Sequence, residues 1–211
     1  HPGPDAYKGK KAVVIGSNNS AHDICAALWE NDVDVTMVQR TTTHIVRSDT
    51  LMEVGLGAPY SEEAVANGVT TAKADLIFAS LPYAILHEFQ IPAYAEMKKR
   101  DADFYEGLEK AGFWLDWGDD ETGLFLKYLR RGSGYYIDVG ASQLIIDGEI
   151  KLAHGQVTEV VEDGVVLDDG TKLSSDPTKT ARDMGLREGS SLIVDVLKIP
   201  ITIKTHDGKT L

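Results

Sequence analysis

The sequence has few of the features that commit a chain to a membrane, a disulfide scaffold or nucleic acid. Its single cysteine, Cys25, excludes an internal disulfide and favours a reducing compartment, so we expect a cytoplasmic protein. No apolar run approaches the roughly 18 residues of a membrane span, and no signal-peptide pattern opens the sequence. Basic residues are outnumbered, 21 against 33 acidic ones, and the formal net charge of −12 argues against nucleic-acid binding.

The remaining composition is ordinary for a folded protein, with 43% hydrophobic and 26% charged residues over 211 positions. This length can bury a sizeable core as one large domain, or as a domain with a small appendage. The sequence begins at His1 rather than at methionine, so we expect a fragment or a processed form. An anionic ligand would need a local site that works against the overall negative field.

The first 40 residues predict a β-α-β unit. Residues 12–15 form an apolar run typical of a buried parallel strand, and Gly16 ends it where the chain must turn into a helix. Apolar residues recur at helical spacing over residues 21–28, which places Cys25 in the core. Asn31 and Asp32 end the helix, and a second, alternating strand follows.

The turn between the first strand and the helix, GSNNSA, resembles the dinucleotide-binding pattern G-x-G-x-x-G. Gly16 fills the first glycine position and Ala21 the third, while Asn18, a residue that tolerates positive φ, takes the second. Backbone N–H groups at the helix start would face a pyrophosphate, and either Asn19 or Ser20 would cap the helix. A strand-to-helix turn without a ligand is the alternative. The side chains that offer further hydrogen bonds are those of Ser17, Asn18, Asn19 and Ser20. We expect the neighbouring His22 to be solvated.

Arg40 follows the second strand, at the place where NAD-binding loops usually carry an acidic residue. A carboxylate there would repel a 2′-phosphate, whereas a guanidinium binds it through two charge-assisted hydrogen bonds. Thr41 adds a hydroxyl donor. The alternative for Arg40 is a surface arginine at a strand end. Together with the loop, Arg40 favours NADP(H) over NAD(H).

The residue composition, and with it the predicted secondary structure, then changes twice along the sequence. Residues 41–131 carry aromatic and charged residues with few β-branched runs, and they are predicted to be mostly helical. Short strands with Gly and Asp-Gly turns are expected from Gly132 onward. We therefore predict an α/β fold, a three-layer Rossmann-like NAD(P)-binding domain over residues 1–173. It would have a helical insertion at about 41–131 and a β-rich C-terminal part.

One stretch resembles the NADPH-binding region of flavin-containing monooxygenases, especially microbial members: KKAVVIGSNNSAHDICAALWENDVDVTMVQRTTTHIVRSDTLM. In that family the second nucleotide-binding motif reads G-x-x-N-S-A or similar, and a strand ending in arginine follows it. The resemblance continues through about residues 1–173. It implies that Gly16 through Ala21 contact the NADPH pyrophosphate, and that Arg40 and Thr41 contact the 2′-phosphate.

The same resemblance implies an activity. In such enzymes NADPH reduces FAD, and the reduced flavin transfers one oxygen atom to a soft nitrogen or sulfur centre of a small-molecule substrate. The glycine fingerprint for FAD and the family's A-T-G-Y motif are not found in this sequence. We therefore expect the NADPH half of a monooxygenase, which needs a flavin-binding domain and does not turn over alone. No catalytic residue is assigned, and no metal site is expected.

Residues 174–211 depart from the family pattern. Their pieces DPTKTARDMGLREGSSLIVDV and KIPITIKTHDGKTL resemble the closing and opening segments of a ubiquitin-like domain, in that order. This order would suit a fusion junction, a permuted chain or an incorrect gene model, and the alternative is an ordinary terminal extension that completes the sheet. Three hypotheses follow: an NADPH-binding part of a flavin monooxygenase, a dinucleotide-binding regulatory domain without redox activity, or a fusion whose tail is a protein-interaction module.

Overall fold

The computed structural model describes residues 3–175 of the chain. The chain divides into two compact units. Unit 1 consists of the residues up to Thr41 and those from Asp147 onward, and unit 2 is Thr42–Ile146. Unit 2 is thus inserted between two strands of unit 1. The domain limits expected from the sequence, 1–173 with an insertion at about 41–131, stay a prediction, and the tail hypotheses concern residues that lie outside the described part from Asp176 onward.

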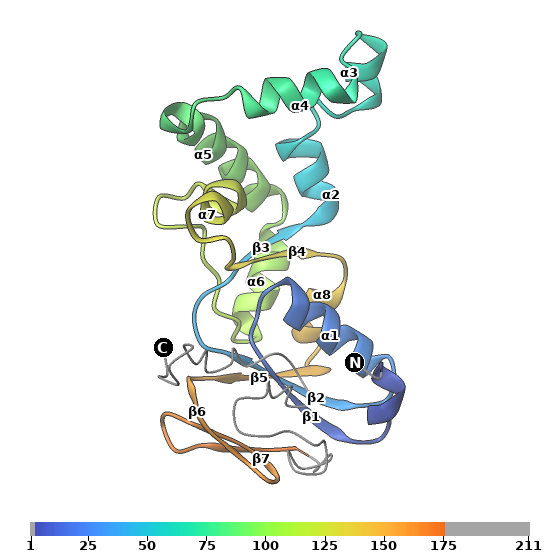
Figure 1. Cartoon of the computed structure of the whole chain (residues 1–211), viewed down its shortest axis with the longest axis vertical. Coiled ribbons are helices and arrows are strands. Elements are labelled where there is room, and N and C mark those ends of the chain that lie inside the picture. The colour runs from blue at the N-terminus through green and yellow to red at the C-terminus, as the bar shows by residue number, and fades with distance from the viewer. Residues whose placement is uncertain (1–2, 176–211) are drawn as a thin grey trace, which may run out of the picture. The chain divides into compact units, whose positions relative to one another are not determined.

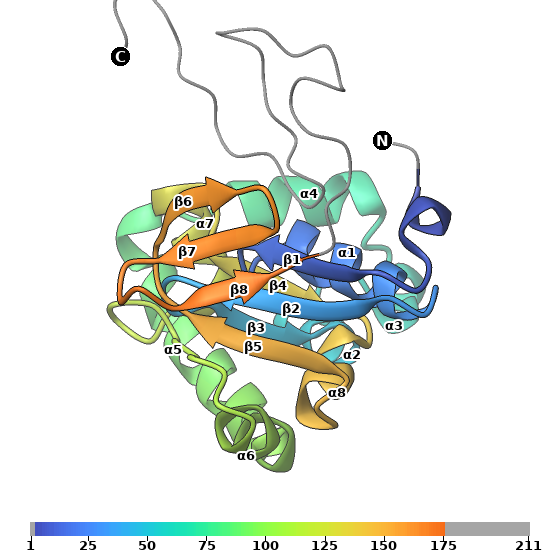
Figure 2. The ribbon, with the colours of Figure 1, turned by 90° about the horizontal axis from the view of Figure 1, so that it is seen from below.

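A parallel sheet of three strands, in the order β1–β2–β5, forms the middle of unit 1 (Figures 1 and 2). The strands are β1 (Lys11–Ile15), β2 (Asp34–Gln39) and β5 (Ile150–His154). The first two confirm the strands that the sequence predicted. The third pairs with β2, with Val35 opposite Ile150, although the whole of unit 2 separates them in the sequence.

Helix α1 (Asn19–Trp29) connects β1 to β2 and buries Ala21, Cys25 and Leu28. This apolar stripe and the fully buried Cys25 confirm the sequence prediction. The chain leaves the helix through a turn in which Asp32 has a φ of 58°, a left-handed conformation that aspartate tolerates better than most residues. A short 3₁₀ helix, η1 (Pro4–Tyr7), precedes β1.

A small antiparallel sheet packs against the parallel sheet of unit 1. It consists of β6 (Val157–Val161), β7 (Gly164–Leu167) and β8 (Lys172–Ser174) in that order. Val165 and Leu167 of β7 form a buried cluster with Val13 and Val38 of the parallel strands. Because side chains alternate along a strand, the neighbouring Val14 points to the opposite face, toward the helix layer. Unit 1 is therefore the α/β, three-layer Rossmann-like fold that the sequence predicted.

Unit 2 is mostly helical, as expected for this part of the sequence. Two short parallel strands, β3 (His44–Arg47) and β4 (Tyr135–Asp138), pair with each other. Strand β4 lies in the segment from Gly132 onward, where short strands were expected. Strand β3 lies within the residues that were predicted to be mostly helical, because a short apolar run does not distinguish a strand from a helix. The helices are α2 (Ser48–Thr50), the π-helical turn η2 (Leu51–Gly55), α3 (Glu62–Ala66), α4 (Thr71–Ala79), α5 (Tyr83–Arg100), α6 (Ala102–Lys110), α7 (Gly123–Arg131) and α8 (Ala141–Ile146).

Helix α8 corrects one sequence expectation, because its residues were read as part of a strand-rich segment. The side chain of Asp138 accepts hydrogen bonds from the backbone N–H of Gly140 (3.3 Å) and of Ser142 (3.0 Å). These bonds satisfy N–H groups at the start of the helix. Such bonds favour a helix start, and the apolar pattern of the sequence does not reveal them.

The core of unit 2 contains a buried histidine. His44 is fully buried, its Nδ1 lies 3.0 Å from the carbonyl oxygen of Asp116, and its ring meets Tyr94 and Trp117 edge-on at 5.2 Å. Burial lowers the pKa of His44 to about 4, although the Asp116 carbonyl opposes this shift. His44 is therefore neutral at pH 7.

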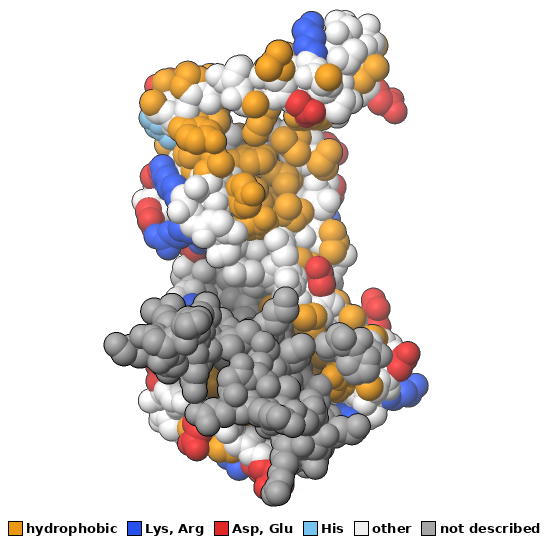
Figure 3. All heavy atoms as spheres, viewed as in Figure 1, with side chains coloured by type: hydrophobic (Ala, Val, Ile, Leu, Met, Phe, Trp, Pro, Cys, Tyr) orange, Lys and Arg blue, Asp and Glu red, His pale blue; other side chains and the backbone are white. Residues whose placement is uncertain are grey.

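Unit 2 also leaves apolar side chains in solvent. Leu76, Tyr83 and Phe89 of α4 and α5 are exposed, and Figure 3 shows hydrophobic side chains gathered on the visible face of this unit. These exposed side chains do not indicate a membrane span: none of the helices among the described residues is both long and apolar enough to cross a membrane.

Candidate nucleotide site

The turn after β1 is built around Gly16. This residue has a φ of +129°, a conformation that side chains rarely adopt, and its N–H donates to the Val38 carbonyl at 2.9 Å. That bond ties the turn to β2. A Cβ on Gly16 would lie 3.8 Å from the Cβ of Ala21, an ordinary contact distance, so backbone conformation rather than space requires glycine. Ala21, which is buried, packs the helix closely behind the turn.

The helix start differs in detail from the sequence expectation. Asn18 is the N-cap residue of α1, with no side-chain cap hydrogen bond, so the predicted cap by Asn19 or Ser20 is wrong. Asn18 has a φ of −98°, which means that its position does not use the tolerance of asparagine for positive φ. Its carbonyl instead accepts the N–H of Ala21 (3.0 Å) and of His22 (3.1 Å).

His22 was expected to be solvated, and this prediction is wrong. The side chain is fully buried, and its Nδ1 lies 3.1 Å from the carbonyl oxygen of Asn18. A histidine on the first helical turn of an amphipathic pattern gives no sequence signal for burial, because its imidazole is polar. In the fold, the His22 imidazole stabilises the backbone of the loop at the helix start through its contact with the Asn18 carbonyl.

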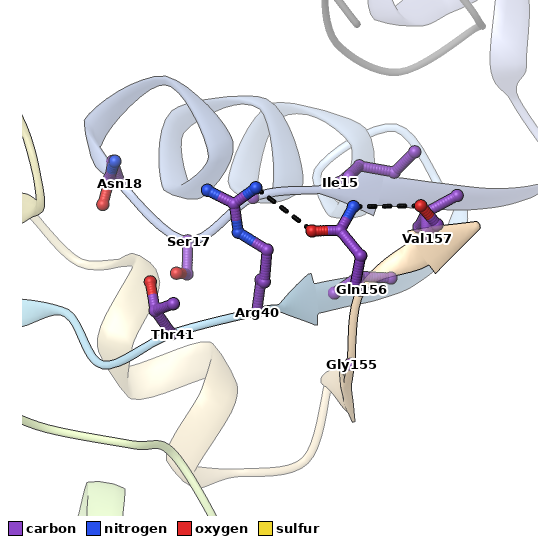
Figure 4. Close-up of a pocket in the computed structure, with 10 residues that line it drawn as sticks. Ile15, Ser17, Asn18, Arg40, Thr41, Gly155, Gln156 and Val157 are labelled. Carbon is purple, nitrogen blue, oxygen red and sulfur yellow. Dashed lines mark hydrogen bonds between the residues drawn. The ribbon is translucent and has the colours of Figure 1, made fainter. Parts of the chain in front are cut away.

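Arg40 and Thr41 extend from the end of β2 toward the same loop. Figure 4 shows the Arg40 side chain directed toward α1, with the hydroxyls of Ser17 and Thr41 to one side of it and Gln156 to the other. Arg40 Nη1 donates a hydrogen bond to Gln156 Oε1 at 3.2 Å. Within the described part of the chain, Arg40 makes no salt bridge to a carboxylate, so its charge is not neutralised there.

These residues surround one pocket at the carboxyl edge of the parallel sheet. Its volume is about 410 Å³. Five predicted site residues line it, namely Gly16, Ser17, Asn18, Arg40 and Thr41. The other three, Asn19, Ser20 and Ala21, are not among its lining residues, and they lie on the first turn of α1.

Five lining residues were not among the candidates from the sequence. Ile15 and Val38 form part of the apolar lining, and Gly155, Gln156 and Val157 come from the turn between β5 and β6. Gly155 after a predicted strand marked a turn in the sequence, but nothing local indicated that this turn lies beside Arg40. The pocket thus combines an apolar surface, polar loop groups and a single cationic side chain.

Unit 1 has the layered α/β fold of proteins that bind dinucleotides at the carboxyl ends of parallel strands. Comparison with known families agrees with that class: residues 2–94 match the family described as pyridine nucleotide-disulphide oxidoreductase. The matched stretch contains β1, α1 and β2 with the loop between them, and it is less than half of the chain.

No curated protein matches the chain. Among solved structures, a crystal structure of cyclohexanone monooxygenase from Rhodococcus sp. Phi1 bound to NADP+ is similar, with 17% sequence identity and a TM-score of 0.45. The similarity covers 81% of this chain and 38% of that one. The chain therefore spans well under half the length of that structure.

Proposed function

We propose that this chain is the NADPH-binding part of a flavin-dependent monooxygenase that oxygenates a soft nitrogen or sulfur centre. The observation that carries the nucleotide assignment is the pocket, in which the loop after β1 and the Arg40 side chain line one cavity. The family match of residues 2–94 supports a pyridine-nucleotide oxidoreductase. The monooxygenase assignment rests on the resemblance of the loop and the following strand to flavin-containing monooxygenases.

The residues present fit a dinucleotide with an anionic centre. The first N–H groups of an α-helix have no acceptor within the helix, and the helix dipole favours an anion beside them. Gly16, Ser17 and Asn18 bring the backbone to this position, and the hydroxyl of Ser17 lies in the same pocket. The pyrophosphate would be held here, while Asn19 and Ser20 would contribute from the first turn.

The adenosine end would be held at the end of β2. Arg40 is the only charged side chain among the described residues that line the pocket, and a guanidinium matches a phosphate monoester through paired hydrogen bonds. Thr41 would add one hydroxyl. Because the chain as a whole carries a charge of −12, this local cation is what would attract a 2′-phosphate.

When bound, NADPH supplies a hydride for the reduction of FAD, and the reduced flavin supplies the oxygen chemistry. The role of the residues described here is to bind and orient the nucleotide. The glycine loop after β1 serves NADPH in this proposal, so FAD would be held by a flavin-binding domain with a glycine loop of its own.

Calorimetric titration of the 211-residue protein with NADPH and, separately, with NADH tests the proposal. We expect both nucleotides to bind at one site, and NADPH to bind about tenfold more tightly, the value of one charge-assisted contact. Absence of binding by a protein with a cooperative thermal transition would refute the nucleotide assignment. Tight binding in a longer form of the protein that never retains flavin would favour the regulatory alternative over the monooxygenase.

A further inference from the structure

The turn between β5 and β6 is held firmly beside the end of β2. The N–H of Gly155 donates to the carbonyl of Gln39 at 3.2 Å, which fixes the turn to the residue before Arg40. Gln156 exchanges two hydrogen bonds with Asp168: its N–H donates to Oδ1 at 3.1 Å, and its carbonyl accepts the Asp168 N–H at 2.9 Å. The backbone of Gln156 is therefore fixed from two sides.

The close approach of Asp168 also explains the glycine in this turn. Gly155 has a φ of +144°, and a Cβ there would lie 2.7 Å from Asp168 Oδ1, closer than real Cβ atoms come to another heavy atom. Asp168 reaches the Gln156 N–H because Gly155 has no side chain. The conformation of this turn therefore fixes the position of the Gln156 Cα, from which its side chain extends.

The side-chain amide of Gln156 is oriented as well. Its Nε2 donates to the carbonyl oxygen of Val157 at 2.9 Å, which leaves Oε1 to accept the Nη1 hydrogen of Arg40 at 3.2 Å (Figure 4). A guanidinium has only donors, so only the oxygen of the amide can receive it. Because glutamine is neutral, this contact orients Arg40 without neutralising its charge.

We propose that Gln156 is a positioning residue of the nucleotide site, which holds the Arg40 guanidinium at the pocket and thereby sets the preference for a 2′-phosphorylated dinucleotide. This inference rests on the proposed function. An arginine side chain has several rotatable bonds, and fixing it in advance reduces the entropy lost when a phosphate binds. Gln156 acts through Arg40 and needs no contact of its own with the nucleotide.

The test compares two substitutions of nearly the same size. Gln156→Met removes the hydrogen bond to Arg40, and NADPH affinity should fall about three- to tenfold, while NADH affinity changes less than about twofold. Gln156→Glu places a carboxylate against the guanidinium, which neutralises it and repels the phosphate, so the loss of NADPH affinity should exceed that of Gln156→Met. Gln143→Glu in unit 2, an exposed residue that does not line the pocket, is the matched control for the added charge, and it should leave both affinities unchanged.

A double substitution distinguishes positioning from a general structural effect. With Arg40→Ala already in place, Gln156→Met should change NADPH affinity by less than about twofold, because the residue to be positioned is gone. Both side chains are exposed, so each variant should keep the wild-type unfolding temperature.

Equal losses for NADPH and NADH in Gln156→Met, or an undiminished loss in the Arg40→Ala background, would overturn the inference while leaving the proposed function intact. Unchanged affinities in both Gln156 variants would overturn it too. A wild-type protein that binds neither nucleotide would overturn the proposed function and, with it, this inference.

Discussion

Replacement of Arg40 by alanine is the sharpest perturbation of the proposed site. The side chain is exposed, and its only hydrogen bond to a described residue is the one to Gln156, so its removal leaves no buried group without a partner. Folding should therefore be unaffected. The change removes the one positive charge that lines the pocket and nothing from the loop after β1.

The magnitude follows from the type of contact. A hydrogen bond to a charged group contributes about 1.5–3 kcal/mol, and solvent around Arg40 favours the lower end. We expect a loss of about 1.5 kcal/mol, which is slightly more than tenfold in the dissociation constant for NADPH. NADH has no 2′-phosphate, so its affinity should change less than about twofold. Arg40→Lys keeps the charge but loses the paired geometry, and it should lose about half as much binding free energy.

Calorimetric titration of both nucleotides at two salt concentrations measures these effects. The NADPH affinity of the wild-type protein should fall with added salt more steeply than that of Arg40→Ala, because ions screen an exposed charge pair. Lys172→Ala is the control, since it removes a positive charge from β8 of the same unit but does not line the pocket. If Arg40→Ala weakens NADPH and NADH equally, or if Lys172→Ala reproduces its effect, Arg40 does not recognise the 2′-phosphate.

Three further predictions concern the loop and the two cores. Gly16→Ala places a side chain at a φ of +129°, so the unfolding free energy should fall by about 1–3 kcal/mol and both nucleotides should bind more weakly. Unchanged stability in urea denaturation would show that Gly16 does not adopt this backbone conformation. The pKa of His44, lowered by burial from 6.5 to about 4, makes the unfolded state bind more protons between these values. The contribution of neutral His44 to the unfolding free energy is therefore fully present above pH 6.5 and is lost as pH falls toward 4, by about 2 kcal/mol between pH 7 and pH 5. His44→Gln should remove this part of the pH dependence of stability. Burial raises the pKa of the Cys25 thiol, so the folded protein should resist iodoacetamide and the urea-unfolded protein should react fully; rapid labelling of the native protein would contradict the buried position.

Much of unit 1 was predictable because its signals are local. An apolar strand, a glycine turn and a helical stripe occur within residues 11–29, and each depends on neighbours only a few positions away. The position of Arg40 followed from the same logic. A residue that ends the second parallel strand lies at the same sheet edge as a loop that ends the first.

Errors arose where a local pattern did not determine the partner. The sequence around Asn18 allowed several capping residues, and His22 carried no sign that its imidazole would be buried against the Asn18 carbonyl. In the segment with α8, the side chain of Asp138 accepts N–H groups at the start of a helix that the sequence pattern did not indicate. Such choices depend on individual hydrogen bonds, which periodicity does not encode.

The sequence by itself determined the β-α-β unit, its glycine loop and the cation at the strand end, since hydrophobic period and turn chemistry act over short distances. Only the tertiary structure decided which side chain lies beside Arg40. Gln156 lies 116 residues after Arg40, and the two meet because β5 pairs with β2 after the chain has passed through the whole of unit 2. Strand pairing across an insertion depends on long-range packing, and no local pattern in either segment specifies it.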